Sequence, residues 1–200
     1  MSNNIGNISS TNNNGNPTLT SDNSIFCSSF YFESFFDDKQ IKSFIKNTEK
    51  MIRESNSYKE YISLLRAYSD LSKDNINSNV TTNDTVIEFH HYPLNLYMIV
   101  ETVMNYHVIK KEKFNSFMLA KEILQLHFDN KIGLVPLHST NHQLAHLYKI
   151  FISDKQIFGN WREFIKEYEI GLTPAAIELL EKFDQLNASG QATDYLDIYK

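Results

Sequence analysis

Residues 85–93 (TVIEFHHYP) and residues 133–146 (GLVPLHSTNHQLAH) decide the fold of this 200-residue chain. The first stretch opens with a β-branched run, which favours a strand. Residues 131–137 (KIGLVPL) read as a second short strand. Ser139 or Thr140 can then cap a helix. The order strand, strand, helix therefore predicts a small ββα unit.

The histidines of these stretches form two pairs whose spacing is suited to binding a metal ion. All 7 histidines of the chain lie between positions 90 and 146. His90 and His91 are strand neighbours and point to opposite faces, so one imidazole can face a metal ion and the other a substrate. His142 and His146 lie four apart on the predicted helix and share one face. Three imidazole ligands with an open fourth position are typical of a catalytic metal site.

The remaining histidines can be explained without a metal site. His107 and His127 end helices, where the helix dipole favours a cation, and His138 either supports the site or has no role. Glu88, two before His90, shares its strand face and could reach the metal, or it is an exposed carboxylate at the strand edge. For His90, His91, His142 and His146 together we favour a metal site, because four residues match one motif in order.

The rest of the chain divides around this unit. Residues 2–24 are almost entirely Asn, Ser, Thr and Gly, which predicts a disordered tail. Helical periodicity then predicts a two-helix hairpin before the first strand, and two further helices inserted between the strands. The predicted fold class is α+β, mostly helical, with a small ββα-metal core that carries a two-helix insertion. Its parts are a tail (1–24), an N-terminal helical region (25–84), the core (85–150) and a helical extension (151–200).

Composition limits the classes of function. Lys and Arg number 19 against 24 Asp and Glu, a net charge of -5, which excludes a generally basic nucleic-acid coat protein. The single cysteine, Cys27, allows no internal disulfide and no multi-cysteine zinc site. The chain has no apolar run long enough to span a bilayer and starts with polar residues. We therefore expect a soluble protein of the cell interior without a membrane partner.

The order HHYP, LVPL and STNHQLAH resembles the HNH, or ββα-metal, nuclease motif, especially the colicin-type DNases whose helix carries HxxxH. The resemblance implies a divalent ion, of the zinc or magnesium type, held by His90, His142 and His146. It implies that His91 is the general base that activates water. Pro93 matches the HH-x-P pattern of the family.

The chain departs from that family in three ways. Gly133 stands where the second strand usually begins with Asn, and Asn130 is a displaced candidate for that role. Two helices lengthen the connection between the strands, and the usual excess of basic residues is missing. Four lysines near the inserted helices could still contact nucleic acid, although lysines on helical surfaces are ordinary solvation: Lys110, Lys111, Lys113 and Lys131.

Two functions remain open at the level of sequence. The first is an HNH-like, metal-dependent endonuclease that hydrolyses nucleic-acid phosphodiesters. The second is a non-catalytic phage structural or transcription-complex protein built on a degenerate HNH-like fold, with a phage or host protein partner. EFHHYP, GLVPLHSTNHQLAH and the segment FIKNTEKMIRESNSYKEYISLLRA are also similar to a group of tailed-phage proteins. A phage origin implies the host cytoplasm or the virion.

Overall fold

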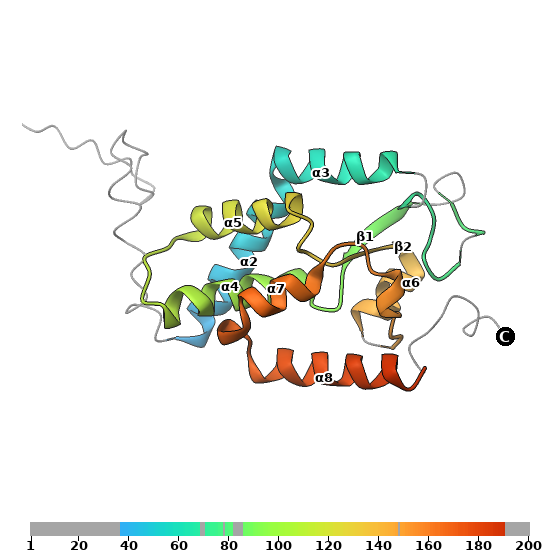
Figure 1. Cartoon of the computed structure of the whole chain (residues 1–200). Helices are drawn as coiled ribbons and strands as arrows, with labels where there is room; N and C mark the ends of the chain where they lie inside the picture. The colour runs from blue at the N-terminus through green and yellow to red at the C-terminus, as the bar shows by residue number, and fades with distance from the viewer. Residues whose placement is uncertain (1–36, 69–70, 78, 82–85, 148, 191–200) are drawn as a thin grey trace, which may run out of the picture.

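A computed structural model describes residues 37–68, 71–77, 79–81, 86–147 and 149–190. The predicted N-terminal tail, Cys27 and the last ten residues lie outside these ranges. The described part is mostly helical with one two-stranded antiparallel sheet, which confirms the predicted α+β class (Figure 1). Its elements are α2 Asp38–Glu54, α3 Asn56–Ala67, β1 Ile87–His91, α4 Leu96–Ile109, α5 Ser116–Phe128, β2 Leu134–His138, α6 Ser139–His146, η3 Asp154–Gln156, α7 Trp161–Glu167, η4 Glu169–Gly171 and α8 Pro174–Ala188.

The strands and α6 form the predicted ββα unit. Strand β1 pairs with β2 in antiparallel register, with Glu88 opposite Leu137 and His90 opposite Val135. Helix α6 begins directly after β2 and packs on both strands. Helices α4 and α5 lie between the strands in sequence, as the periodicity predicts, and the side chains of Asn95 and Asn115 cap them.

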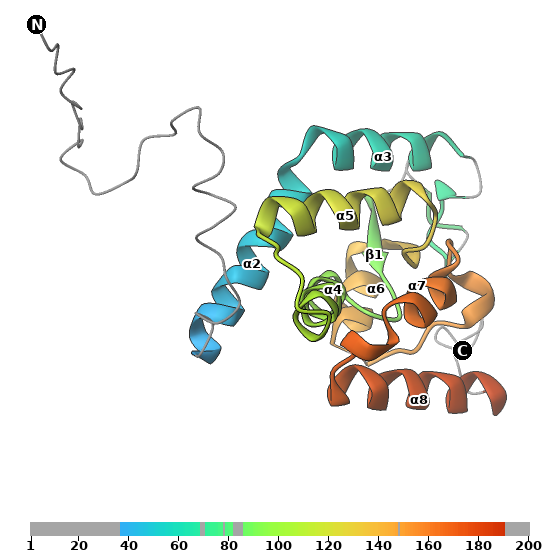
Figure 2. The same ribbon diagram turned by 60° about the vertical axis from the view of Figure 1, so that its left-hand side comes forward.

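The N-terminal helices do not form the predicted hairpin. Ser55 alone links α2 to α3 and caps both helix ends. A helical hairpin needs a loop of about two to five residues to reverse the chain. Helix α2 packs instead along α4 and α5, and α3 continues past α5 (Figures 1 and 2). The hairpin prediction was wrong because one residue cannot turn the chain back.

For the C-terminal part, the sequence predicts a short strand at residues 156–158 and a final helix that Thr173 caps and Pro174 opens. The strand prediction was wrong, because these residues form the end of η3 and a single bridge between Phe158 and Leu134. The final helix is present as α8, with Thr173 as its cap and Pro174 in its first turn.

A continuous apolar core joins the helices to the sheet. Helix α4 lies at its centre, in contact with α2, α5 and η4, while α3 and α8 lie at opposite sides of the molecule (Figure 2). A smaller cluster under α3 covers one face of the sheet and contains Tyr61, Leu65, Leu71, Phe89 and Leu134. None of the described helices is both long and apolar enough to cross a membrane.

Gly133 is dictated by the close approach of another chain segment. A Cβ atom at this position would lie 2.0 Å from the carbonyl oxygen of Tyr92 and 3.1 Å from the Cβ of Trp161. The Gly133 carbonyl also accepts a hydrogen bond from the Tyr92 N–H at 3.0 Å. The position where the HNH family usually has Asn therefore has no room for a side chain in this fold.

His107 joins three helical segments through two carboxylates. Its Nδ1 lies 2.6 Å from Glu112 Oε2 and its Nε2 lies 2.7 Å from Glu122 Oε2. The Tyr168 hydroxyl donates to the other oxygen of Glu122 at 2.7 Å. Because ionised carboxylates only accept, both ring nitrogens must donate, so this imidazole is protonated. The hydrogen bond with Glu122 raises the pKa of His107, which burial alone would lower.

We predict that Gly133→Ala lowers the free energy of unfolding by about 2–3 kcal/mol, because an added methyl group must displace backbone atoms. Urea denaturation followed by circular dichroism measures this loss. Gly190→Asn is the matched control, because Gly190 has a φ of 71° in open space and Asn tolerates that conformation. Equal losses in the two variants would contradict the assigned role of Gly133.

We also predict that the His107 bridge stabilises the fold most below about pH 6.5, the ordinary pKa of an unfolded histidine. Since the folded pKa is raised, the contribution is complete below that value and is lost as the pH rises through the folded pKa. His107→Gln should cost about 1–2 kcal/mol at pH 6 and less at pH 9. The measurement is urea denaturation of both proteins at each pH. A difference that does not change with pH would show that His107 acts without its charge.

Candidate functional site: a histidine cleft beside the sheet

Strand alternation gives the two faces of β1 different environments. Glu88 and His90 face α6, and Glu88 Oε2 lies 2.5 Å from His142 Nδ1. Phe89 and His91 face the opposite side, where the His91 ring stacks on Tyr58 at 6.1 Å between centroids. The sequence prediction that the paired histidines point to opposite faces is thus confirmed.

Three of the predicted site histidines come together on the α6 side. The ring centroid of His90 lies 4.8 Å from that of His142 and 6.0 Å from that of His146. His142 and His146 are 6.5 Å apart by the same measure. Among the described residues, no three His, Cys, Asp or Glu side chains lie close enough together to hold a metal ion. The structure therefore shows a cluster of three imidazoles, with one pair closer than the others.

His90 is the buried member of this cluster. It is 6% exposed, and its ring has no hydrogen-bond partner among the described residues. Burial lowers its pKa to about 3, with further contributions from His142, His146 and Arg53. At neutral pH this imidazole is uncharged, which is the protonation state that binds metal ions.

His91 lies in a different network. His127 Nδ1 donates to the Ile123 carbonyl at 2.7 Å, so His127 Nε2 must accept the hydrogen bond that His91 Nε2 donates at 3.0 Å. Burial lowers the pKa of His91 well below its usual range and that of His127 to about 4. The predicted general base is 3% exposed, and its Nε2 is engaged away from the three clustered imidazoles.

A buried carboxylate holds α6 in place. Asp74, which is 1% exposed, accepts hydrogen bonds from the backbone N–H and Nδ1 of His138 at 2.5 and 2.7 Å, and from Asn141 Nδ2 at 3.1 Å. The N-cap residue of α6, His138, makes no side-chain cap of its own. Asp74 thus anchors the start of α6 from another part of the chain, so the predicted accessory residue His138 has a structural role in positioning the helix of His142 and His146.

The histidine cluster opens into a cleft of about 470 Å³. Arg53 and Glu49 of α2 form part of its wall, with Arg53 Nη2 3.9 Å from Glu49 Oε1. Burial raises the pKa of Glu49, and Arg53 opposes that shift. The lining residues are Glu49, Arg53, Phe89, His90, His91, Asn95, Leu96, Tyr97, His142, Gln143 and His146.

The other predicted site residues do not line this cleft. Lys110 and Lys111 follow the far end of α4, which begins at the cleft and extends roughly 20 Å from it at 1.5 Å per residue. Lys113 lies beyond them in sequence, and Lys131 pairs with Glu167 at 2.7 Å. Asn130 occupies a turn with φ 59° after α5. The predicted nucleic-acid contacts thus lie away from the histidine cluster.

Arg53 and Glu49 were missed by sequence reasoning. They lie 37 or more positions before His90, on a helix that looks ordinary by its periodicity. The available signal was a row of basic residues on the face of α2 opposite its apolar residues, but no local pattern says which element this face approaches.

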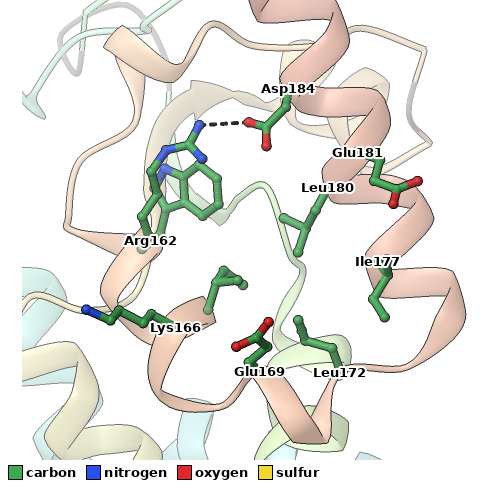
Figure 3. A pocket seen from close by; sticks show the side chains of 10 residues that line it. Arg162, Lys166, Glu169, Leu172, Ile177, Leu180, Glu181 and Asp184 are labelled. Atoms are coloured by element: carbon green, nitrogen blue, oxygen red, sulfur yellow. Dashed lines mark hydrogen bonds and ion pairs between the residues drawn. The ribbon is translucent and has the colours of Figure 1, made fainter.

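A second hollow, between α7 and α8, has different chemistry (Figure 3). Its volume is about 460 Å³, and apolar side chains such as Ile165 and Leu180 form much of its wall. Arg162 crosses one side, donating to Asp184 at 2.8 Å and to Asp154 at 3.1 Å. No histidine or cysteine lines this hollow, and its charged side chains include the ion-paired Arg162 and Asp184, so the histidine cleft is the better candidate for a functional site.

Searches of curated proteins and of solved structures each found no significant match. A scan against protein-family models matched residues 1–198 to the family described as bacteriophage G278-like virion protein. This match agrees with the phage resemblance of the sequence and covers almost the whole chain. The chain belongs to the bacteriophage G278-like virion protein family.

Proposed function

We propose that the chain is a non-catalytic structural component of the phage particle, and that its histidine cleft holds a divalent transition-metal ion. Membership of a virion protein family supports a place in the particle. The burial and bonding of His91 carry the non-catalytic part of the proposal, because a general base must reach the water that it activates. Although His91 borders the cleft, its side chain is only 3% exposed and its Nε2 donates to His127 on the other face of the strand.

The donor set fits a transition-metal ion. His90 supplies a buried, neutral imidazole that has no hydrogen-bond partner among the described residues. The Glu88 carboxylate contacts Nδ1 of His142, which leaves Nε2 of His142 to bind an ion. A carboxylate behind a histidine is the usual support for an imidazole that binds a metal.

The spacing of the rings also suits an ion. With metal–nitrogen bonds of about 2.0–2.1 Å, neighbouring ring centroids in a tetrahedral site lie roughly 5 Å apart. The His90–His142 distance of 4.8 Å meets this value. The His146 ring centroid is farther away, at 6.0 Å from that of His90 and 6.5 Å from that of His142. Because His146 is exposed at the end of α6, a change of its side-chain rotamer could bring it closer.

An ion at this position would supply folding energy. Helix α6 has only eight residues, which is too short to be stable without tertiary contacts. Ligands from both α6 and β1 would connect the helix to the sheet, in addition to the hydrogen bonds that Asp74 accepts from His138 and Asn141. A metal-dependent endonuclease is the second candidate, favoured by the order of the histidines in the sequence.

We predict that Zn²⁺ binds the purified chain at one site and raises its Tm. At a free concentration of about 100 times Kd the gain in stability is about 2.7 kcal/mol. His146→Ala should abolish most of this gain, whereas Gln143→Ala, an exposed neighbour on α6, should retain it. Isothermal titration calorimetry and thermal melts with and without EDTA measure both effects. Equal zinc binding by the His146→Ala protein would contradict the assigned ligands.

We further predict that the chain is present in purified phage particles and does not cleave DNA. Mass spectrometry of gradient-purified, nuclease-treated particles should detect it at a stoichiometric level. The purified chain should leave supercoiled plasmid intact with magnesium, manganese, nickel or zinc. Metal-dependent cleavage that His91→Ala abolishes would replace the structural function with the endonuclease.

A further inference from the structure

We infer that the exposed face of α2 docks an acidic helical segment of another protein of the phage particle. This face carries Lys39, Lys42, Lys46 and Arg53, which we call the basic stripe. The proposal builds on the particle role proposed above but does not depend on the metal ion.

The basic stripe follows one line along the helix. Successive members are three, four and seven positions apart, so they lie within roughly 40° of one direction at 100° per residue. The buried residues of α2, such as Ile45 and Ile52, lie on other sides of the helix. Helix α2 forms an edge of the molecule, and its described contacts are with α3, α4 and α5 (Figure 2).

The lysines of the stripe form no close ion pair within the described structure, although Lys46 interacts electrostatically with Glu49. Lys39, Lys42 and Lys46 form no ion pair with any described residue, whereas Lys50 on the flank of the helix pairs with Glu54 at 3.9 Å. Arg53 has Glu49 as a partner at the same distance. The stripe carries four positive charges and encloses one negative charge, in a chain whose net charge is -5. Such a separation of charge favours an anionic partner.

Acidic residues at the ends of the basic stripe and within it limit the kind of anion that can bind there. Asp37 and Asp38 flank it at one end, and Glu54 flanks it at the other. Glu49 interrupts it beside Arg53, and both side chains line the histidine cleft. Each strand of duplex DNA carries one phosphate charge per about 3.4 Å, so a strand that followed α2 would place several phosphates against these carboxylates.

A short acidic helix avoids this conflict. Carboxylates placed every three or four residues recur about once per turn, or roughly 5.4 Å, which is the spacing of the lysines. The stretch from Lys39 to Arg53 matches about four turns of such a helix. Its other face would remain available to the body of the partner protein. The observations therefore favour an acidic protein segment over nucleic acid.

The test is fluorescence anisotropy with the full chain and a fluorescein-labelled 16-residue helical peptide that carries Glu at alternating three- and four-residue spacing. The peptide should bind, and the double variant Lys42→Gln, Lys46→Gln should weaken binding about tenfold. The control is Lys59→Gln, Lys121→Gln, which removes two exposed lysines from α3 and α5 with the same change in net charge. It should bind the peptide like the unchanged chain.

Several outcomes would overturn the inference. Equal binding of a peptide with Gln in place of Glu would exclude recognition by charge, and equal weakening in the control variant would exclude the stripe as the site. Tighter binding of a 16-nucleotide oligo-dT that depends on Lys42 and Lys46 would assign the stripe to nucleic acid. Self-association in sedimentation velocity that the Lys42, Lys46 variant abolishes would make a second copy the occupant. Because the chain's presence in the particle is measured separately, failure here is distinguishable from failure of the proposed function.

Discussion

The buried carboxylate of Asp74 determines the geometry on which the histidine cleft depends. It accepts hydrogen bonds from the N–H groups of Ile76 and Asn77, from two groups of His138, and from Asn141. Hydrogen bonds to a charged group contribute about 1.5–3 kcal/mol each, and together they offset the cost of burying the charge. They fix the connection before β1, the end of β2 and the first turn of α6 as one unit. Together with the contact between Glu88 and His142, they hold His142 and His146 beside β1.

The alternation of β1 then divides the histidines between two kinds of environment. On the α6 side the rings face a cleft, and on the opposite side they are enclosed by α3 and α5. The enclosed network is completed by the Ile123 carbonyl, which fixes the tautomer of His127 and hence the direction in which His91 donates. This arrangement provides an internal polar contact without any cation. Its protonation at low pH would leave two charges in the core, so the same contact sets a lower pH limit for the fold.

Much of the fold could be predicted from the sequence because its signals are local. The β-branched run, the apolar periodicity and the cap at Thr173 place the strands and helices nearly where the structure has them, whereas the predicted cap at Ser139 or Thr140 was wrong because α6 begins at Ser139 with His138 as its N-cap. The meeting of His90 with His142 and His146 followed from the ββα order. Asp74 lay in a polar, Asn-rich segment that reads as a connection, and its five donors include groups 64 and 67 positions away. Long-range contacts of this kind leave no periodic trace in the sequence.

The remaining gap concerns which face of an element is covered. Alternation placed His90 and His91 on opposite sides, but only the packing of α3 and α5 decides that His91 is the enclosed one. Likewise, the basic row on α2 is visible in the sequence, whereas the fact that Arg53 lines the histidine cleft is a result of tertiary packing. The order of the histidines along the chain therefore does not decide their chemistry. The helices that cover the two faces of β1 decide which imidazoles face the cleft and which are held in internal hydrogen bonds.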